Sequence, residues 1–253
     1  MHVKSLCLWS ATAVLIAGCG SRQAPAADNS GATYELVVLQ RPDSAENYAK
    51  VERGIYDLCV AAAQANHSSA KPFPQLPATL GATQSTYLIR GRDRVVREEM
   101  LAALDTSKDT PDHQCEVDVT PSRILHVDLV VGATHTSIGA DKSVTTEDIS
   151  DLRSAEAASR PQSTAKYSDP LTVNGVDLRC LPTGKPPIDG DLVQQMCVYA
   201  HDGVLVEPDG KPIVLASRVR LTANSPVKIK EPKSLRTIEH PDASQFNPAT
   251  YTR

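Results

Sequence analysis

The residues best suited to chemistry in this sequence are His126 and Asp128, which are separated by one residue in the segment Ile124–Val131. That segment alternates apolar and polar side chains, as a strand with one buried face does. The alternation places the imidazole and the carboxylate on the same polar face, and His135 follows a few residues later. Such a pair can bind a metal ion or orient an imidazole for proton transfer.

The surroundings of this pair favour a plainer interpretation. No third metal ligand stands at a recognisable spacing, and alternating strands place polar side chains in solvent by default. The sequence also contains no G-x-S-x-G, G-x-G-x-x-G, P-loop or H-E-x-x-H motif. We therefore expect no metal, no cofactor and no catalytic residue. In the alternative function, an envelope hydrolase, His126 and Asp128 would be the residues used.

A second reactive side chain, the thiol of Cys19, follows a short basic region and the apolar stretch Leu6–Ala17, which is too short to cross a bilayer as a helix. The residues Leu15-Ile16-Ala17-Gly18-Cys19 resemble the lipobox of bacterial lipoproteins. This resemblance implies cleavage before Cys19, a diacylglyceryl group on its thiol, further acylation of the new amino terminus, and a durable membrane anchor. In that family an Asp after the cysteine favours the inner membrane. Gly20 here implies the outer membrane, facing the periplasm. The alternative is an ordinary secretory signal with an incidental cysteine.

Four cysteines remain after such processing: Cys59, Cys115, Cys180 and Cys197. An even number of cysteines in an oxidising compartment predicts two disulfides. Four cysteines allow three pairings, and nearness in the sequence favours Cys59 with Cys115 and Cys180 with Cys197. The alternatives are a metal site, for which no C-x-x-C pair exists, and free thiols.

Composition limits the classes of partner and the make-up of the core. The chain carries 26 Lys and Arg against 30 Asp and Glu, a formal net charge of −4, and has no basic tract. This argues against nucleic acid as a partner. Only two Phe and one Trp are present, and Trp9 lies in the signal segment. The core must therefore consist mainly of Val, Leu, Ile and Ala, which disulfides would help to stabilise.

Local patterns predict the main elements. The run Thr33–Gln40 is typical of a strand. A helix is expected after Asp43 or Ser44, because Tyr48, Val51, Ile55, Leu58 and Ala62 recur on one face. A strand over Thr86–Arg90 and a helix over Asp93–Leu104 follow. Cys115–Val119 and Ile124–Val131 are expected to form a hairpin, and Asn174-Gly175 marks another.

The expected fold class is α+β: a helix-bearing N-terminal part with short strands, followed by a mostly antiparallel β-meander, with two disulfides. The expected organisation is a signal peptide (1–18), an acylated cysteine and flexible tether (19–32), an α+β part (33–140), a linker or weak helix from Thr145 or Thr146 through Ala158 (141–170), an antiparallel β part (171–223) and a Pro-rich extended tail (224–253).

These features together favour a non-enzymatic function. We expect a lipid-anchored protein of the cell envelope that presents a surface to an envelope protein or an incoming effector, as an inhibitor or immunity protein would. The anchor, the tether and the missing catalytic motifs motivate this hypothesis. Its partners would be the membrane, through the lipid, and one protein.

Overall fold

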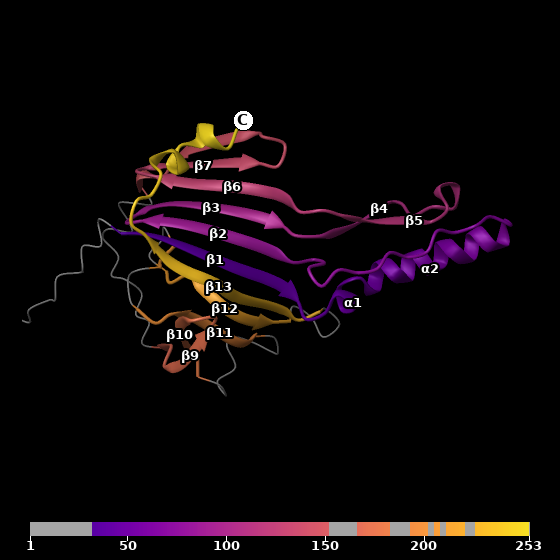
Figure 1. Ribbon diagram of the computed structural model, residues 1–253, viewed down its shortest axis with the longest axis horizontal. Helices are drawn as coiled ribbons and strands as arrows, with labels where there is room; N and C mark the ends of the chain where they lie inside the picture. Colours follow the sequence, from indigo (N-terminus) through magenta and orange to yellow (C-terminus); the bar gives the residue numbers. More distant parts are fainter. Residues whose placement is uncertain are drawn as a thin grey trace, which may run out of the picture.

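A computed structural model describes residues 32–151, 166–182, 193–201, 205–207, 211–220 and 226–252. Within these residues the chain forms one eleven-stranded antiparallel sheet and a separate two-stranded sheet. The order of the large sheet is β8-β7-β6-β3-β2-β1-β13-β12-β11-β10-β9 (Figure 1). The lipobox at residues 15–19 lies outside the described residues.

The strands are β1 (Thr33–Pro42), β2 (Thr83–Arg90), β3 (Asp93–Met100), β4 (Ala103–Lys108), β5 (Glu116–Thr120), β6 (Arg123–Val131), β7 (Thr134–Gly139), β8 (Val144–Asp148), β9 (Asp169–Val173), β10 (Val176–Cys180), β11 (Val193–Tyr199), β12 (Val214–Val219) and β13 (Lys228–Ile238). The helices are α1 (Ala45–Tyr48) and α2 (Lys50–Ala65), with the short 3-10 turns η1 (Pro111–His113), η3 (Ala243–Phe246) and η4 (Pro248–Thr250).

Strand β1 runs through the middle of the sheet, between β2 and β13. The middle of its sequence, Leu36-Val37-Val38-Leu39, is apolar and partly β-branched, which suits a strand covered on both faces. On one face Leu36 and Val38 pack with Tyr87 and Ile89 of β2 and with residues of β10, β11 and β12. Because β10, β11 and β12 belong to the same sheet, the sheet must curl for this cluster to close (Figure 1).

The opposite face is covered by the C-terminal segment. Phe246 of η3 packs in a cluster with five sheet residues: Leu88, Val95, Val127, Leu129 and Ile138. The guanidinium of Arg90 lies 4.2 Å from the centre of the Phe246 ring. Figure 1 shows this segment lying beside β6 and β7. Both faces of the central strands are therefore buried.

Helix α2 and the hairpin β4–β5 extend beyond the end of the large sheet (Figure 1). Cys59 of α2 is bonded to Cys115, directly before β5, and Ala63 packs against this disulfide. The hydroxyl of Tyr56 donates to the carbonyl oxygen of Lys71 at 2.6 Å. We call α2, the connection 66–82 and the hairpin 103–120 the arm.

No helix among the described residues is long and apolar enough to span a membrane.

Several sequence predictions are confirmed. Both disulfides have the predicted pairing, and Cys180 lies opposite Cys197 on neighbouring strands. Asn174 and Gly175 adopt φ values of 50° and 77° and join β9 to β10. This is the positive-φ turn that such a hairpin requires. Ser44 caps α1, because the backbone N–H of Asn47 donates to its Oγ at 3.0 Å.

The predicted helix over Asp93–Leu104 is wrong. Its first eight residues form β3, which pairs with β2 through a turn at Gly91, where φ is +57°, and with β6 on its other side. Val95 enters one core cluster and Val96 packs against the other. Only a strand sends consecutive side chains to opposite faces. The spacing of four residues between Val96, Met100 and Leu104, which suggested a helix, was coincidental.

The division into a helix-bearing part and a later antiparallel part is also not observed, because strands from both parts join one sheet and the helices are few. The expected extended tail, 224–253, contains β13, the partner of β1. Pro232 made this strand hard to recognise, since proline cannot donate a ladder hydrogen bond. It is tolerated because the register shifts between Val37 and Val38, and Pro232 lies opposite Val38 at that irregularity.

Two further expectations about pairing fail. The strands β5 and β6 both exist, but β5 pairs with β4 and β6 with β3, so they do not form a hairpin. Pro121 and Ser122 instead connect the arm to the sheet. The weak helix expected from Thr145 or Thr146 begins as strand β8, paired with β7. Residues 152–158 of that prediction lie outside the described residues.

Removing the disulfide of the arm should loosen the arm alone. In a variant with Cys59→Ser and Cys115→Ser, we expect amide hydrogen exchange of α2 and β5 to rise at least about tenfold, because only a small cluster then holds them. Exchange in β1 and β13 should stay unchanged. The paired Cys180→Ser and Cys197→Ser variant is the control, in which protection should fall in β10 and β11. Equal loss of protection in β1 and β13 of the first variant would contradict this account.

Candidate functional site

Five side chains on four neighbouring strands form what we call the histidine row: Glu98, His126, Asp128, His135 and Glu147. Nε2 of His126 lies 3.3 Å from Oε2 of Glu98 and 3.2 Å from Oδ2 of Asp128. Nε2 of His135 lies 3.3 Å from Oδ1 of Asp128, and its Nδ1 lies 2.7 Å from Oε1 of Glu147. Asp128 therefore contacts both imidazoles, one with each carboxylate oxygen.

The register of the sheet brings these residues together. Glu98 of β3 lies opposite His126 of β6, and Glu147 of β8 lies opposite His135 of β7. Residues directly opposite each other on antiparallel strands share a face. The side chains of His126, Asp128 and His135 are 36%, 27% and 30% exposed. The row is thus partly shielded from solvent and still open to small ions.

Sequence reasoning named His126 and Asp128 and noted His135, but it missed Glu98 and Glu147. Both glutamates fell in segments predicted as helices, where strand alternation was not considered. Strand alternation over Asp93–Met100 places Glu98 on the same face as Arg94 and Val96. The choice of His126 as its partner depends on register between strands distant in sequence, which spacing along the chain does not give.

The partners of the two imidazoles bear on the hydrolase hypothesis. Among the described residues, every recorded partner of His126 and His135 is a carboxylate, and none is a hydroxyl or a thiol. A serine or cysteine hydrolase needs a nucleophile within hydrogen-bond reach of its base. Within the described residues, the histidine row therefore joins imidazoles to carboxylates.

A tighter group of potential metal ligands lies in the arm. In the part of the chain that the structure describes, Cys59, Asp109 and Cys115 are the one set whose ligand atoms all lie within 4.8 Å of one another. Burial raises the pKa of Asp109, and neither of its carboxylate oxygens has a hydrogen-bond partner. The two sulfur atoms are bonded to each other. While that disulfide is intact they are not thiolate ligands.

A partly buried charged group lies on the same sheet face as the histidine row. Arg94 of β3 forms an ion pair with Glu207. Burial, and to a smaller extent the Glu207 carboxylate, raise the pKa of Tyr87 to about 12. Burial lowers the pKa of Lys230 of β13, opposed by Glu207 and Glu98. Because Glu207 precedes β12 in the chain, this group ties the curled end of the sheet to its centre.

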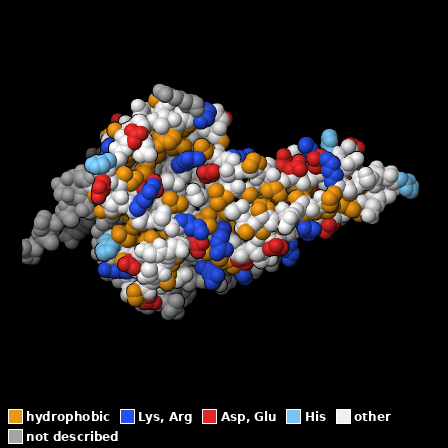
Figure 2. Space-filling model, viewed as in Figure 1, with side chains coloured by type: hydrophobic (Ala, Val, Ile, Leu, Met, Phe, Trp, Pro, Cys, Tyr) orange, Lys and Arg blue, Asp and Glu red, His pale blue; other side chains and the backbone are white. Residues whose placement is uncertain are grey.

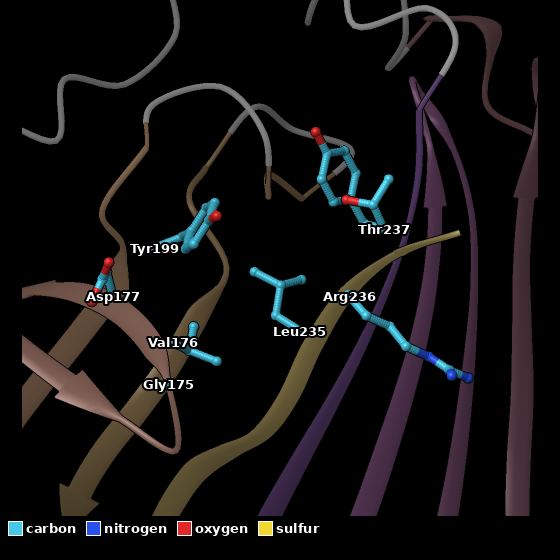
Figure 3. A pocket seen from close by; sticks show the side chains of 8 residues that line it. Gly175, Val176, Asp177, Tyr199, Leu235, Arg236 and Thr237 are labelled. Atoms are coloured by element: carbon cyan, nitrogen blue, oxygen red, sulfur yellow. The ribbon is translucent and has the colours of Figure 1, made fainter. Parts of the chain in front are cut away.

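A small hollow of about 170 Å³ lies between β1, β10, β11 and β13 (Figure 3). It is lined by Tyr34, Gly175, Val176, Asp177, Tyr199, Leu235, Arg236 and Thr237. Its charged groups are already engaged: Asp177 accepts from Thr172 Oγ1 at 2.8 Å, and Arg236 donates to Glu35 at 2.7 Å. Figure 3 shows the Arg236 side chain pointing away from Tyr199. The hollow thus offers little free polar chemistry to a ligand.

A larger hollow of about 420 Å³ lies between the sheet and the C-terminal turns. Its lining is Arg123, Ile124, Val127, Ile138, Gly139, Ala140, Lys142, Thr250 and Tyr251. The ammonium group of Lys142 donates to the carbonyl oxygen of Tyr251 at 3.0 Å, which closes one side. This hollow is mainly the space left where the C-terminal segment crosses the sheet.

The arm carries an exposed apolar surface on α2. The predicted apolar face of the helix does not pack on the sheet, because Val51, Ile55 and Leu58 are 69%, 52% and 74% exposed. We call the exposed uncharged face of α2 the apolar strip: Val51, Gly54, Ile55, Leu58, Ala61, Ala62 and Ala65. Figure 2 shows hydrophobic side chains gathered along the arm.

The other side of α2 is firmly held. The Tyr56 and Phe73 rings meet edge to face with centroids 5.1 Å apart, and the Arg53 guanidinium lies 4.1 Å from the centre of the Phe73 ring. Lys71 pairs with Glu116 of β5 at 2.7 Å. These contacts, with the disulfide, fix the helix on the hairpin. The apolar strip therefore faces solvent from a supported helix and not from a loose one.

The pKa of Tyr87 predicts a loss of stability in alkali. An unfolded tyrosine ionises near pH 10, so the folded protein holds this proton more tightly, and stability should fall between about pH 10 and 12 by about 2–3 kcal/mol. The lowered pKa of Lys230 acts in the opposite direction, but only up to about pH 10.4. Urea unfolding after brief exposure to pH 10.5 and 11.5 measures this slope. Tyr87→Phe should make the slope shallower without abolishing it, because burial also raises the pKa values of Tyr199 and Tyr251. An unchanged slope would show that the Tyr87 phenol is not a source of it.

Comparison of the chain with known protein families, with curated proteins and with solved structures finds no match in any of the three.

Proposed function

We propose that this protein is a lipid-anchored protein of the cell envelope that binds another protein through its arm and catalyses no reaction. The observation that carries the proposal is the apolar strip, a helix face without a charge that remains exposed on a disulfide-supported helix. Soluble proteins seldom expose contiguous apolar surface without a binding role. Val51, Ile55 and Leu58 would each contribute about 1.5–3 kcal/mol when buried by a partner, before the costs of association.

The chemistry of the strip indicates the kind of partner. Gly54 and three alanines leave the helix backbone open to close approach, while Ile55 and Leu58 offer larger side chains between them. This combination suits an apolar helix of the partner lying along α2. Lys50 and Asp57 lie beside the apolar strip. They would set the orientation of the partner's helix by pairing with opposite charges on it. The partner we propose is an envelope protein with such an amphipathic helix.

The position of the arm fits this function. The tether joins the domain at Thr33, the first residue of β1, and the chain enters the arm after Pro42, the last. Ten residues of strand span about 30 Å. The arm and the start of β1 thus lie at opposite ends of the sheet (Figure 1). An acylated Cys19 in the outer membrane would leave the arm directed into the periplasm.

Charging the apolar strip should abolish capture of the partner. We expect the lipidated, tagged protein to retain one partner in stoichiometric amount from gently solubilised envelopes. A variant with Ile55→Lys and Leu58→Lys should retain at least about tenfold less, because burying two ammonium groups is unfavourable. Lysine is a good helix former, so the helix itself should persist.

The matched control is Val144→Lys, which charges an apolar residue that is 48% exposed on β8, away from the arm. It should retain the partner as the wild type does. Thermal unfolding should be similar in all three proteins, since exposed positions tolerate such changes. Equal recovery from the arm variant and the wild type, or a wild-type protein that retains no partner, would refute the proposal.

A further inference from the structure

The carboxylate of Asp109 in the arm has no partner in the described part of the chain. Both of its oxygens are buried without a hydrogen bond, and it is the one carboxylate among the described residues in that state. The ammonium group of Lys108, its neighbour in the chain, lies 3.8 Å from Asp118 and 3.9 Å from Glu116 instead. A buried polar group without a partner is rare, and a bound ion or a redox role is the usual reason for one.

Two sulfur atoms lie beside this carboxylate. The sulfurs of Cys59 and Cys115 and a carboxylate oxygen of Asp109 all lie within 4.8 Å of one another. They come from α2, from the residue before β5 and from the turn after β4. The backbone N–H of Cys115 donates to the carbonyl oxygen of Thr110 at 2.9 Å, which holds this turn against the disulfide. The arm thus brings three ligand-type side chains together from three separate segments.

Reduction of the disulfide would make these side chains a metal-binding set. A dithiol that attacks the disulfide is itself oxidised to a disulfide and leaves two thiols on the arm. Zinc binds cysteine as the thiolate, so Zn²⁺ displaces both thiol protons to water.

The spacing of the three side chains fits tetrahedral zinc. Bonds of about 2.3 Å to sulfur and about 2.1 Å to oxygen place the two sulfurs about 3.8 Å apart and each sulfur about 3.6 Å from the oxygen. The Cα atoms of Cys59 and Cys115 are 5.8 Å apart, so rotation of the two side chains reaches this spacing without a shift of the helix.

We propose that the reduced arm binds one Zn²⁺ ion through the thiolates of Cys59 and Cys115 and the carboxylate of Asp109. Water occupies the fourth position, as at other zinc sites with three protein ligands. Two thiolates favour zinc over magnesium and calcium, which prefer oxygen ligands. The ion takes over the link between α2 and the hairpin that the disulfide makes in the oxidised protein. The site does not depend on the proposed partner, because Cys59 packs with Ala63 on the held side of α2.

Cobalt spectroscopy of the full chain in detergent tests this proposal. A water-soluble phosphine reduces the disulfides, becomes the phosphine oxide and adds no thiol of its own. The reduced wild type should bind one more equivalent of Co²⁺ than the double variant Cys59→Ser and Cys115→Ser, with thiolate-to-cobalt charge-transfer absorption that Zn²⁺ abolishes. The double variant keeps the other four cysteines, so it measures any binding by them. Before reduction, the two proteins should give the same spectrum.

The substitution Asp109→Asn tests the carboxylate. It should weaken binding of Co²⁺ and Zn²⁺ to the reduced chain at least about tenfold, since even groups outside the ligand set of a metal change its affinity by about 10–100-fold. The matched control is Asp112→Asn in η1, which removes the same charge from an exposed residue of the same loop. This control should bind both metals as the wild type does.

Amide hydrogen exchange gives an independent measurement. Reduction should raise exchange in α2 and β5, and saturating Zn²⁺ should restore their protection in the wild type, because a ligand stabilises the state that binds it. Zinc should restore no protection in the double variant. The proposal would be overturned if the reduced wild type bound no more metal than the double variant, or bound it no more tightly than Asp109→Asn. Exchange in the reduced wild type that Zn²⁺ leaves unchanged would also overturn it.

Discussion

The pairing of β1 with β13 is the constraint on which the rest of the structure depends. It joins Thr33 to Ile238 and Pro42 to Lys228, residues from the two ends of the chain, in the middle of one sheet. Every other strand of the large sheet is added outward from this pair. The same pair sets the direction of the molecule, because β1 begins at one end of the sheet and ends at the arm. A long-range pairing of this kind must overcome a large loop-closure entropy. The burial of Leu36, Val38 and Leu39 on β1 helps to offset this cost.

Two surfaces of different chemistry follow from that arrangement. The sheet curls around one core cluster and places carboxylates and imidazoles of neighbouring strands in a row beside it. The arm lies outside both cores of the sheet and has its own disulfide in place of a large core. An element supported in this way can keep an apolar face free, because its stability does not require that face to be buried. The proposed partner accordingly binds at the arm and not at the sheet.

The sequence allowed prediction of the features that depend on local chemistry. The Asn174-Gly175 turn, the Ser44 cap and both disulfides were expected from neighbouring residues and cysteine spacing. The errors involve strand pairing that the local pattern does not identify. Asp93–Met100 has a helical apolar spacing, but its neighbours on both sides made it a strand. The helix α2 was recognised, but the spacing of its apolar residues did not show that Val51, Ile55 and Leu58 stay exposed. Glu98 and Glu147 joined the histidine row only through register.

The central claim is that the exposed face of α2 is a protein-binding surface, and photo-crosslinking in living cells tests it most directly. A photoreactive amino acid at Leu58 should give one discrete crosslinked product containing a single envelope protein. The same group at Val144, which is also exposed but lies on β8, should give no such product. The account would be contradicted if position 58 gave no crosslinked product, or the same set of products as position 144.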